Sequence, residues 1–539
     1  MKDIKQFKFL KHDNIGAADA IDDKFLSDCF VDTGDIAILA DCGDPRSLVV
    51  GRTGSGKTAL LKILEEKQQK IISIPPESLS LSYISNSTIL NFVAELGVNL
   101  DIFYRLLWRH VFTVELLKNH FQINSEEAKR TFLQKLGDYF KNQKQKKALE
   151  YLEAWGKEFW QETEYRIKEV TNTLESEIKT NVGAGISGMN FDMGGISKLS
   201  EAQKGDIIKR SQEVVDKVQI RQLSDIIDLI DEVLTDPQKK YYILIDRLDE
   251  GWIEDKLRYK LIRALIETIK DFRKVRFAKI IVAVRQDLLE RVFRLVRSAG
   301  FQEEKYDSMY LRVSWSKAQL AEIMEKRLNR LIQSRYTHQK VQIHDLLPSK
   351  IEDQDSIDYI LERTMMQPRD VIHFMNKCIQ QAIDKKSITS TLLRSAEGEY
   401  SRDRLRYLAD EWAADYPDLI DFIKILREHR KKFALKDIIS EEFDEFCLEY
   451  TIENPSEPIA ILSVLAREVA YGNCSTDDFM RRLFQIFYKT GIVGLKIEAH
   501  DTYIWSNVRQ KGVSLPEIDS ETKVMIHPAF WRVLGVKIK

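Results

Sequence analysis

A glycine-rich motif near the N-terminus limits what this chain can fold into more than any other stretch. Residues 51–58 read GRTGSGKT and match the pattern G-x-x-x-x-G-K-[ST]. A polyphosphate needs backbone N–H donors at close range, and glycine lets a loop bend and approach that closely. An apolar strand at 47–50 precedes the motif, and an amphipathic helix opening at Ala59 follows it. The motif predicts a strand, a phosphate-binding loop and a helix; the alternative is a glycine turn that binds nothing.

Each residue of the motif has a candidate role in nucleotide binding. Lys57 would neutralise the β and γ phosphates, Thr58 would place its hydroxyl on Mg²⁺, and the dipole of the following helix would favour the anion. The expected cofactors are therefore ATP and Mg²⁺. The predicted nucleotide-binding residues are Gly51, Arg52, Thr53, Gly54, Ser55, Gly56, Lys57 and Thr58.

An acidic strand is needed to complete such a site. Residues 241–245 read YYILI, which is typical of a buried parallel strand, and Asp246 follows at its carboxyl end, where such sheets bind ligands. We expect Asp246 to ligate Mg²⁺ directly or through water, and Asp249 or Glu250 to orient the attacking water. The alternative is an apolar strand followed by a solvated acidic turn.

The next strand, at 278–284, would bring a further polar group to the same edge of the sheet. It ends in Arg285, which could sense the γ-phosphate. In the following helix Arg291, Arg294 and Arg297 lie three residues apart, and one of them could reach a neighbouring subunit as an arginine finger. The alternative for these three residues is a solvated basic face.

The composition indicates a reduced, cytoplasmic protein of several structural units. A chain of 539 residues exceeds what one core supports, so about three or four units are expected. The 82 Lys and Arg balance 84 Asp and Glu, so the overall charge does not indicate nucleic-acid binding. The five cysteines lie far apart, without metal-ligand spacing. The N-terminus lacks a signal-peptide pattern and the longest apolar runs are too short for a bilayer, so we expect no membrane contact.

The middle of the chain predicts a large helical insertion at residues 121–237. Long stretches rich in Glu, Lys, Leu and Ile flank residues 182–198, which hold five of the 23 glycines. Two long helices joined by a glycine-rich tip would form an antiparallel protrusion. A packed helical insert with a loose loop is an equally good interpretation.

Four segments together resemble the ATPase module of the AAA+ and STAND branch of P-loop NTPases: GRTGSGKT, YYILIDRLDE, IIVAVRQ and MMQPRDVIHF. The spacing of Asp246, Asp249 and Glu250 is similar to that of NACHT-type modules. The resemblance implies that Arg285 is a polar sensor and that Arg369, in Pro-Arg-Asp, contacts the γ-phosphate from an origin-recognition-like lid; a helix-start ion pair is the alternative for Arg369. Arg247 departs from the family pattern and puts the identity of the catalytic base in doubt.

A closer resemblance links the chain to a bacterial group of P-loop ATPases that is often encoded in mobile or anti-phage defence loci. It rests on GRTGSGKT, LIDRLDEGW, the aromatic stretch NLDIFYRLLWRHV and the Pro-Arg-Asp lid, and it covers most of residues 20–415. The association with defence comes from the resemblance alone.

The C-terminal residues 479–539 resemble the latter half of a winged-helix domain. An amphipathic helix at 480–488 precedes expected strands at 491–493, 503–505 and 524–528 and a short final helix. Ten Lys or Arg against five Asp or Glu give this segment a modest positive excess. Both nucleic-acid binding and protein docking are consistent with such a segment.

Taken together, these patterns predict an α/β P-loop NTPase core, a parallel sheet with flanking helices, that carries a helical insertion, a helical lid and a winged-helix-like domain. We expect an ATP-hydrolysing regulatory switch that forms a homo-oligomer and controls an effector protein; the alternatives are a nucleic-acid-loading ATPase and a scaffold that binds ATP without turnover. The expected segments are an N-terminal arm (1–45) that packs against the nucleotide fold, the core (46–120 and 238–315), the insertion (121–237), the lid (316–400), a helical linker domain (401–478) and the winged-helix-like domain (479–539).

Overall fold

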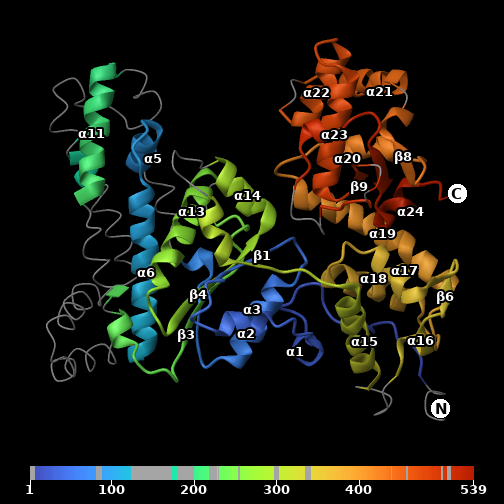
Figure 1. Ribbon diagram of the computed structural model, residues 1–539, viewed down its shortest axis with the longest axis horizontal. Helices are drawn as coiled ribbons and strands as arrows, with labels where there is room; N and C mark the ends of the chain where they lie inside the picture. The colour runs from blue at the N-terminus through green and yellow to red at the C-terminus, as the bar shows by residue number, and fades with distance from the viewer. Residues whose placement is uncertain are drawn as a thin grey trace. The chain divides into compact units, whose positions relative to one another are not determined.

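The computed structural model shows two compact units, which are described separately (Figure 1). The sheet unit comprises residues 32–51 and 57–313, and the helical unit comprises residues 1–31, 52–56 and 314–539. Residues 51 and 57 of the predicted phosphate-binding loop thus belong to the sheet unit, and residues 52–56 belong to the helical unit. The described residues are 7–79, 88–122, 172–176, 178, 199–217, 227–228, 230–252, 255–295, 303–333, 341–438, 440–456, 459–498, 500, 502–506 and 512–538.

A five-stranded parallel sheet forms the core of the sheet unit, which confirms the predicted α/β core. The strand order is β2-β3-β4-β1-β5, and all four pairings are parallel. The five strands are β1 (Leu48–Gly51), β2 (Lys70–Ser73), β3 (Tyr241–Ile245), β4 (Ala278–Arg285) and β5 (Tyr310–Arg312). Of these, β1, β3 and β4 overlap the strands expected at 47–50, 241–245 and 278–284.

Both faces of the sheet are covered, as the continuous apolar strands require. Alternate residues such as Val50, Ile243 and Val282 pack into one cluster with side chains of α13 (Asp255–Phe272) and α6 (Asp101–Phe121). On the other face lie α2 (Asp35–Ala40) and α3 (Lys57–Lys67), and the Lys279 Nζ donates to the carbonyl of Ile38 (2.8 Å). In Figure 1 the sheet runs between α13 and α3.

The aromatic stretch at 103–112 is part of the core of the sheet unit. On α6, Trp108 stacks on Phe112, and the Trp108 Nε1 donates to the carbonyl of Leu261 on α13 (2.9 Å). The predicted glycine-rich tip at 182–198 and most of the predicted insertion lie outside the described residues. This unit also contains η2 (Pro76–Leu79), α5 (Thr88–Glu95), α11 (Glu201–Lys217), α14 (Gln286–Leu295) and η3 (Glu303–Met309).

The first part of the helical unit is the predicted lid, and the N-terminal residues pack with it. The Arg327 Nη2 forms a buried ion pair with Asp23 (2.6 Å), and the Asn376 Nδ2 donates to the carbonyl of Gly16 (3.0 Å). Residues 7–31 therefore differ from the expected arm on the nucleotide fold, because their apolar and acidic side chains are matched by lid helices. The elements are α1 (Leu26–Cys29), α15 (Lys317–Gln333), α16 (Ile343–Leu346), β6 (Lys350–Ile351), β7 (Gln354–Asp355), α17 (Ser356–Glu362), α18 (Pro368–Gln381) and α19 (Ser390–Trp412).

The C-terminal part combines helices with a three-stranded antiparallel sheet in the order β8-β10-β9. The strand β8 was not among the strands expected from the sequence. At the expected strand 503–505 only Ile504 forms a bridge, with Leu495. The elements are α20 (Leu419–Ile423), η4 (Lys424–Leu426), β8 (Lys432–Ala434), η5 (Leu435–Asp437), α21 (Ser440–Glu453), α22 (Ile461–Ala470), α23 (Thr476–Thr490), β9 (Val493–Lys496), η6 (Leu515–Glu517), β10 (Lys523–Ile526), η7 (Pro528–Phe530) and α24 (Trp531–Leu534).

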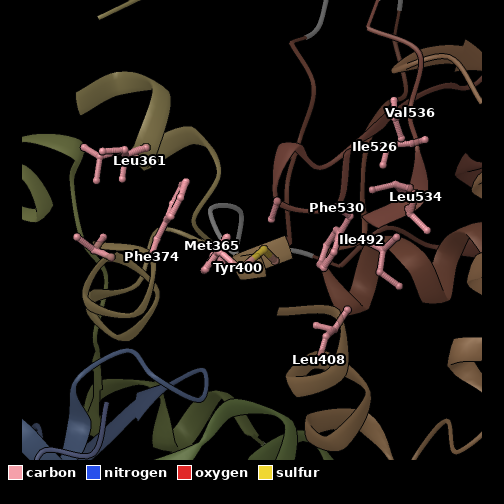
Figure 2. Packing of buried hydrophobic residues seen from close by; sticks show 14 of the residues in the cluster. Leu361, Met365, Phe374, Tyr400, Leu408, Ile492, Ile526, Phe530, Leu534 and Val536 are labelled. Carbon is pink, nitrogen blue, oxygen red and sulfur yellow. The ribbon is translucent and has the colours of Figure 1, made fainter. Parts of the chain in front are cut away.

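One hydrophobic cluster runs through the helical unit from the lid to the C-terminal sheet. Figure 2 shows Phe374 of α18 and Tyr400 of α19 in this cluster together with Ile492, Ile526 and Phe530. The lid and the C-terminal residues therefore share one core. Across the part of the chain that the structure describes, no helix has the length and apolarity needed to span a membrane.

Candidate functional site

The glycine-rich motif forms a tight loop between β1 and α3. The strand ends at Gly51 and the helix begins at Lys57, two residues before the expected start. Gly54 and Gly56 have φ angles of 87° and 97°, which only glycine adopts without strain. The Ser55 N–H donates to the carbonyl of Arg52 (3.2 Å), so the backbone turns back on itself within the motif.

Lys57 lies at the start of α3, with its side chain directed back to the end of β1. The Lys57 Nζ donates to the carbonyl of Gly51 (3.0 Å). Burial lowers the pKa of Lys57 to about 8, and the charges of Asp249 and Asp246 oppose this shift. The ammonium group is thus held in a poorly solvated position, where an anion would stabilise its charge strongly.

The parallel register brings the predicted acidic and basic groups to the carboxyl edge of the sheet. Gly51 is paired with Arg285, and Asp246 directly follows β3. The Arg285 guanidinium forms ion pairs with Asp249 (Nη1–Oδ2, 3.3 Å) and with Asp287 (Nη2–Oδ2, 2.8 Å). Asp287 was missed in the sequence, although its position two residues after Arg285 could have indicated it.

The residue that follows Asp246 has an unusual backbone conformation. Arg247 has a φ of 60°, and its N–H donates to the carboxylate of Asp246 (2.8 Å). Its side chain forms an exposed ion pair with Glu250 (3.3 Å). Partial desolvation raises the pKa of Glu250, whereas the nearby Arg247 lowers it. Glu250 therefore points to Arg247, and Asp249 points to Arg285.

The tip of the loop, residues 52–56, contacts the lid. The Trp315 Nε1 donates to the carbonyl of Ser55 (2.7 Å), and the Arg369 N–H donates to the carbonyl of Gly54 (3.4 Å). A Cβ on Gly54 would lie 3.0 Å from the Arg369 Cβ and 3.1 Å from the Gln367 Oε1. The absence of a side chain at Gly54 therefore allows the start of α18 to approach the loop.

Arg369 lies beside the loop tip, and its Nε donates to the carbonyl of Ala18 (3.3 Å). Its neighbour Asp370 faces Arg404 instead (3.5 Å) and accepts a hydrogen bond from the N–H of Met365 (3.0 Å). In the described part of the chain Arg369 forms no ion pair, so the alternative of a helix-start ion pair is not what the structure shows.

Arg52 connects the loop tip to the C-terminal part of the helical unit. Its Nη2 donates to the carbonyl of Thr490, the last residue of α23 (2.9 Å). Its Nη1 lies 3.1 Å from the position of a Cβ on Gly491. A guanidinium suits this place because the carbonyl end of a helix carries partial negative charge. The sequence offered no signal for this contact, since 438 residues separate the two groups.

His527 lies near this contact and is held in its neutral form. The backbone N–H of His527 donates to the carbonyl of Ile492 (2.9 Å), and its ring Nδ1 accepts a hydrogen bond from the backbone N–H of Ala529 (3.1 Å). Burial lowers the pKa of His527 to about 3, and the positive charges of Arg404 and Arg52 add to the shift. The imidazole is therefore uncharged near neutral pH.

Two hydroxyls of the motif lie in buried positions. Within the described residues, the buried Thr53 Oγ1 and Ser55 Oγ have no hydrogen-bond partner. Buried polar atoms are normally satisfied, so these oxygens fit a polar group bound at the loop. Elsewhere in the described chain, His, Cys, Asp and Glu form no group of three or more that could hold a metal.

The candidate arginine finger is only partly described. Arg291 contacts the Tyr259 hydroxyl (3.3 Å) and Asp287 (3.7 Å), so its guanidinium is held within the sheet unit. Arg294 is exposed at the end of α14, and Arg297 lies outside the described residues.

Two comparisons relate the chain to known proteins. Residues 318–409, from α15 to most of α19, match a family described as the FunZ-associated C-terminal helical domain. The chain is also similar to an Escherichia coli (strain K12) protein whose name assigns it to the transposon gamma-delta and gives a mass of 80.3 kDa; the two are 22% identical over 541 residues. The alignment covers 96% of this chain and 66% of that relative, so the chain spans just under two thirds of the relative's length.

Proposed function

We propose that this chain is an ATP-binding, slowly hydrolysing regulatory switch of the AAA+ and STAND type. The observation that carries the proposal is the position of the loop tip, where Arg52, Gly54 and Ser55 are bound by the lid and the end of α23. A phosphate held by the loop backbone would compete with or rearrange these contacts. Nucleotide binding would thereby be transmitted to the lid and the C-terminal sheet.

The residues at the carboxyl edge of the sheet support the proposal of ATP hydrolysis. Lys57 would neutralise the phosphates, and Thr58 and Asp246 would hold Mg²⁺. Mg²⁺, when bound, would neutralise the charge that develops on the phosphates. Asp249 and Glu250 are the candidate bases that orient water, and both are engaged by arginines. Because these pairs must rearrange before either carboxylate can act, we propose slow turnover, with Arg285 and Arg369 as phosphate sensors.

The switch would act through other molecules. We propose a cytoplasmic protein that forms homo-oligomers in one nucleotide state and controls an effector protein. The name of the transposon gamma-delta relative supports a role connected with mobile elements. The earlier resemblance to ATPases of defence loci points in the same direction.

A nucleic-acid-loading ATPase is the second candidate, and the transposon name of the relative favours it. The antiparallel sheet β8-β10-β9, in which β8 follows α20 and both β9 and β10 follow α23, supports a winged-helix-like domain that begins near residue 419. However, α23 is poorly suited to be a DNA-recognition helix. Its exposed residues include the acidic Asp477 and Asp478, and its aromatic residues Phe484 and Phe487 are buried. We therefore retain the switch as the first proposal.

ATP turnover by the full chain tests the proposal. We expect slow Mg²⁺-dependent hydrolysis that is lost in Lys57→Ala and Asp246→Ala, with Lys67→Ala as a matched lysine control on the exposed end of α3. If the wild-type protein hydrolyses ATP no faster than Lys57→Ala, the proposed ATPase activity is contradicted, and a scaffold that binds ATP without turnover is favoured. Strong stimulation by DNA would favour the loader.

Solution size separates the switch from a monomeric ATPase. We expect light scattering to show a larger species with a slowly hydrolysed ATP analogue than with ADP. A monomer in every nucleotide state would contradict the proposed oligomerisation.

A further inference from the structure

The C-terminal sheet has one buried and one exposed face, and the exposed face is rich in lysine. Phe433, Leu495 and Val524 point into the core, because each is at most 6% exposed. The alternate residues point the other way. Lys523 lies directly opposite Lys496, and Lys432 lies opposite Met525, the next residue on that face.

Placing two lysines directly opposite each other in adjacent strands is unfavourable unless an anion compensates for it. Among the described residues, Lys432, Lys496 and Lys523 form no ion pair with a carboxylate. Glu521, two residues before Lys523, pairs with Lys436 (2.8 Å). The three ammonium groups are thus available to an external anion.

Aromatic side chains border the lysines. The bridge between Leu495 and Ile504 places Tyr503 and Trp505, on either side of Ile504, next to the lysine face. The Lys432 Nζ lies 5.3 Å from the centre of the Tyr503 ring. Trp505 lies over Gly494, where a Cβ would come within 2.7 Å of the indole. Both rings are half-buried, so part of each remains open to solvent.

We propose that this lysine face, defined by Lys432, Lys496, Lys523 and Tyr503, binds single-stranded nucleic acid. The lysines would contact successive phosphates, and the Tyr503 ring would stack on a base. A single strand fits better than a duplex, because the bases of a duplex are already stacked on one another and cannot use the ring.

Fluorescence anisotropy of the full chain with a labelled 30-residue oligodeoxythymidine tests the proposal. The variant Lys432→Gln/Lys496→Gln/Lys523→Gln should bind at least ~10-fold more weakly, and the slope of log K against log salt should fall by about 2, as expected for three lost single-strand phosphate contacts. Tyr503→Leu should weaken binding about 10-fold with little change of slope.

The matched control is Arg481→Gln/Arg482→Gln, which removes charge from α23 and should change the affinity by less than about twofold. Lys57→Ala should bind the oligodeoxythymidine as tightly as the wild type does. The proposal of single-strand binding can therefore be tested even if the proposal of ATP binding fails. An equal loss in the α23 variant, an unchanged affinity in the lysine variant, or equally tight binding of a duplex or of polyglutamate would each overturn the proposal. If the lysine variant keeps the circular dichroism spectrum of the wild type, its loss of affinity does not result from unfolding.

Discussion

The glycine-rich loop is followed by one lysine whose positive charge the protein stabilises only in part. Lys57 is buried, its pKa is lowered to about 8, and it faces the backbone carbonyl of Gly51. Such a group gains most from a bound anion, because an anion restores the stabilisation that burial removes. The glycines at 54 and 56 would allow the backbone to enclose such an anion.

The first prediction concerns the pH dependence of ATP binding. Lys57 is charged below its pKa and loses its proton as the pH rises through about 8. ATP should therefore bind ~10-fold more weakly at pH 9 than at pH 7, with uptake of a proton on binding. Calorimetry in two buffers of different ionisation enthalpy measures both quantities. Lys57→Arg should show no such decline; an identical decline in that variant would assign the effect elsewhere.

A second prediction concerns the buried carboxylate of Glu397, which is 2% exposed. It binds Arg363 (2.6 Å), the Tyr359 hydroxyl (2.7 Å) and Arg532 (3.3 Å). Glu397→Gln would leave the buried guanidinium of Arg363 without its counter-charge and should lower the free energy of unfolding of the helical unit by about 3–5 kcal/mol. Urea unfolding checks this, with Glu445→Gln on an exposed position as the control. A change below ~1 kcal/mol would contradict it.

At the scale of elements, α23 and α18 connect the loop tip to the rest of the helical unit. The start of α18 approaches Gly54, and the end of α23 accepts the guanidinium of Arg52. Both contacts are made to the same five loop residues. A change in the loop would therefore affect both helices.

A third prediction follows for Arg52. Arg52→Ala removes a charged hydrogen bond from the last turn of α23, which should lower the local opening free energy of residues 486–491 by about 1.5–3 kcal/mol. Native-state hydrogen exchange measures this as faster exchange in that turn. Arg52→Lys keeps the charge and should restore part of the protection. Unchanged exchange in Arg52→Ala would show that the contact does not hold the helix.

The strands could be predicted from the sequence because local apolar runs and the following polar residues carry the signal. The apolar runs before Asp246 and before Arg285 predicted both strands. They also predicted that these two charged residues lie at the carboxyl edge of the sheet. Contacts between distant segments gave no such signal. Neither the hydrogen bond of Arg52 to Thr490 nor the packing of residues 7–31 on α15 and α18 could be inferred, because complementarity between remote side chains has no local pattern.

At the scale of the whole molecule, the chain consists of a sheet unit and a helical unit that share one loop in sequence. Residues 51 and 57 belong to the first unit and residues 52–56 to the second. The family match at 318–409 falls within the helical unit, in the lid that contacts the loop tip. These relations are the basis for the proposed switch.

Hydrogen exchange of the full chain with and without Mg²⁺-ATP tests the central claim most directly. We predict that saturating ATP changes exchange at residues 52–56, at the start of α18 and in the last turn of α23, and that Lys57→Ala abolishes all three changes. Exchange in these segments that is the same with and without ATP in the wild-type protein, once calorimetry has shown binding, would contradict the proposed switch.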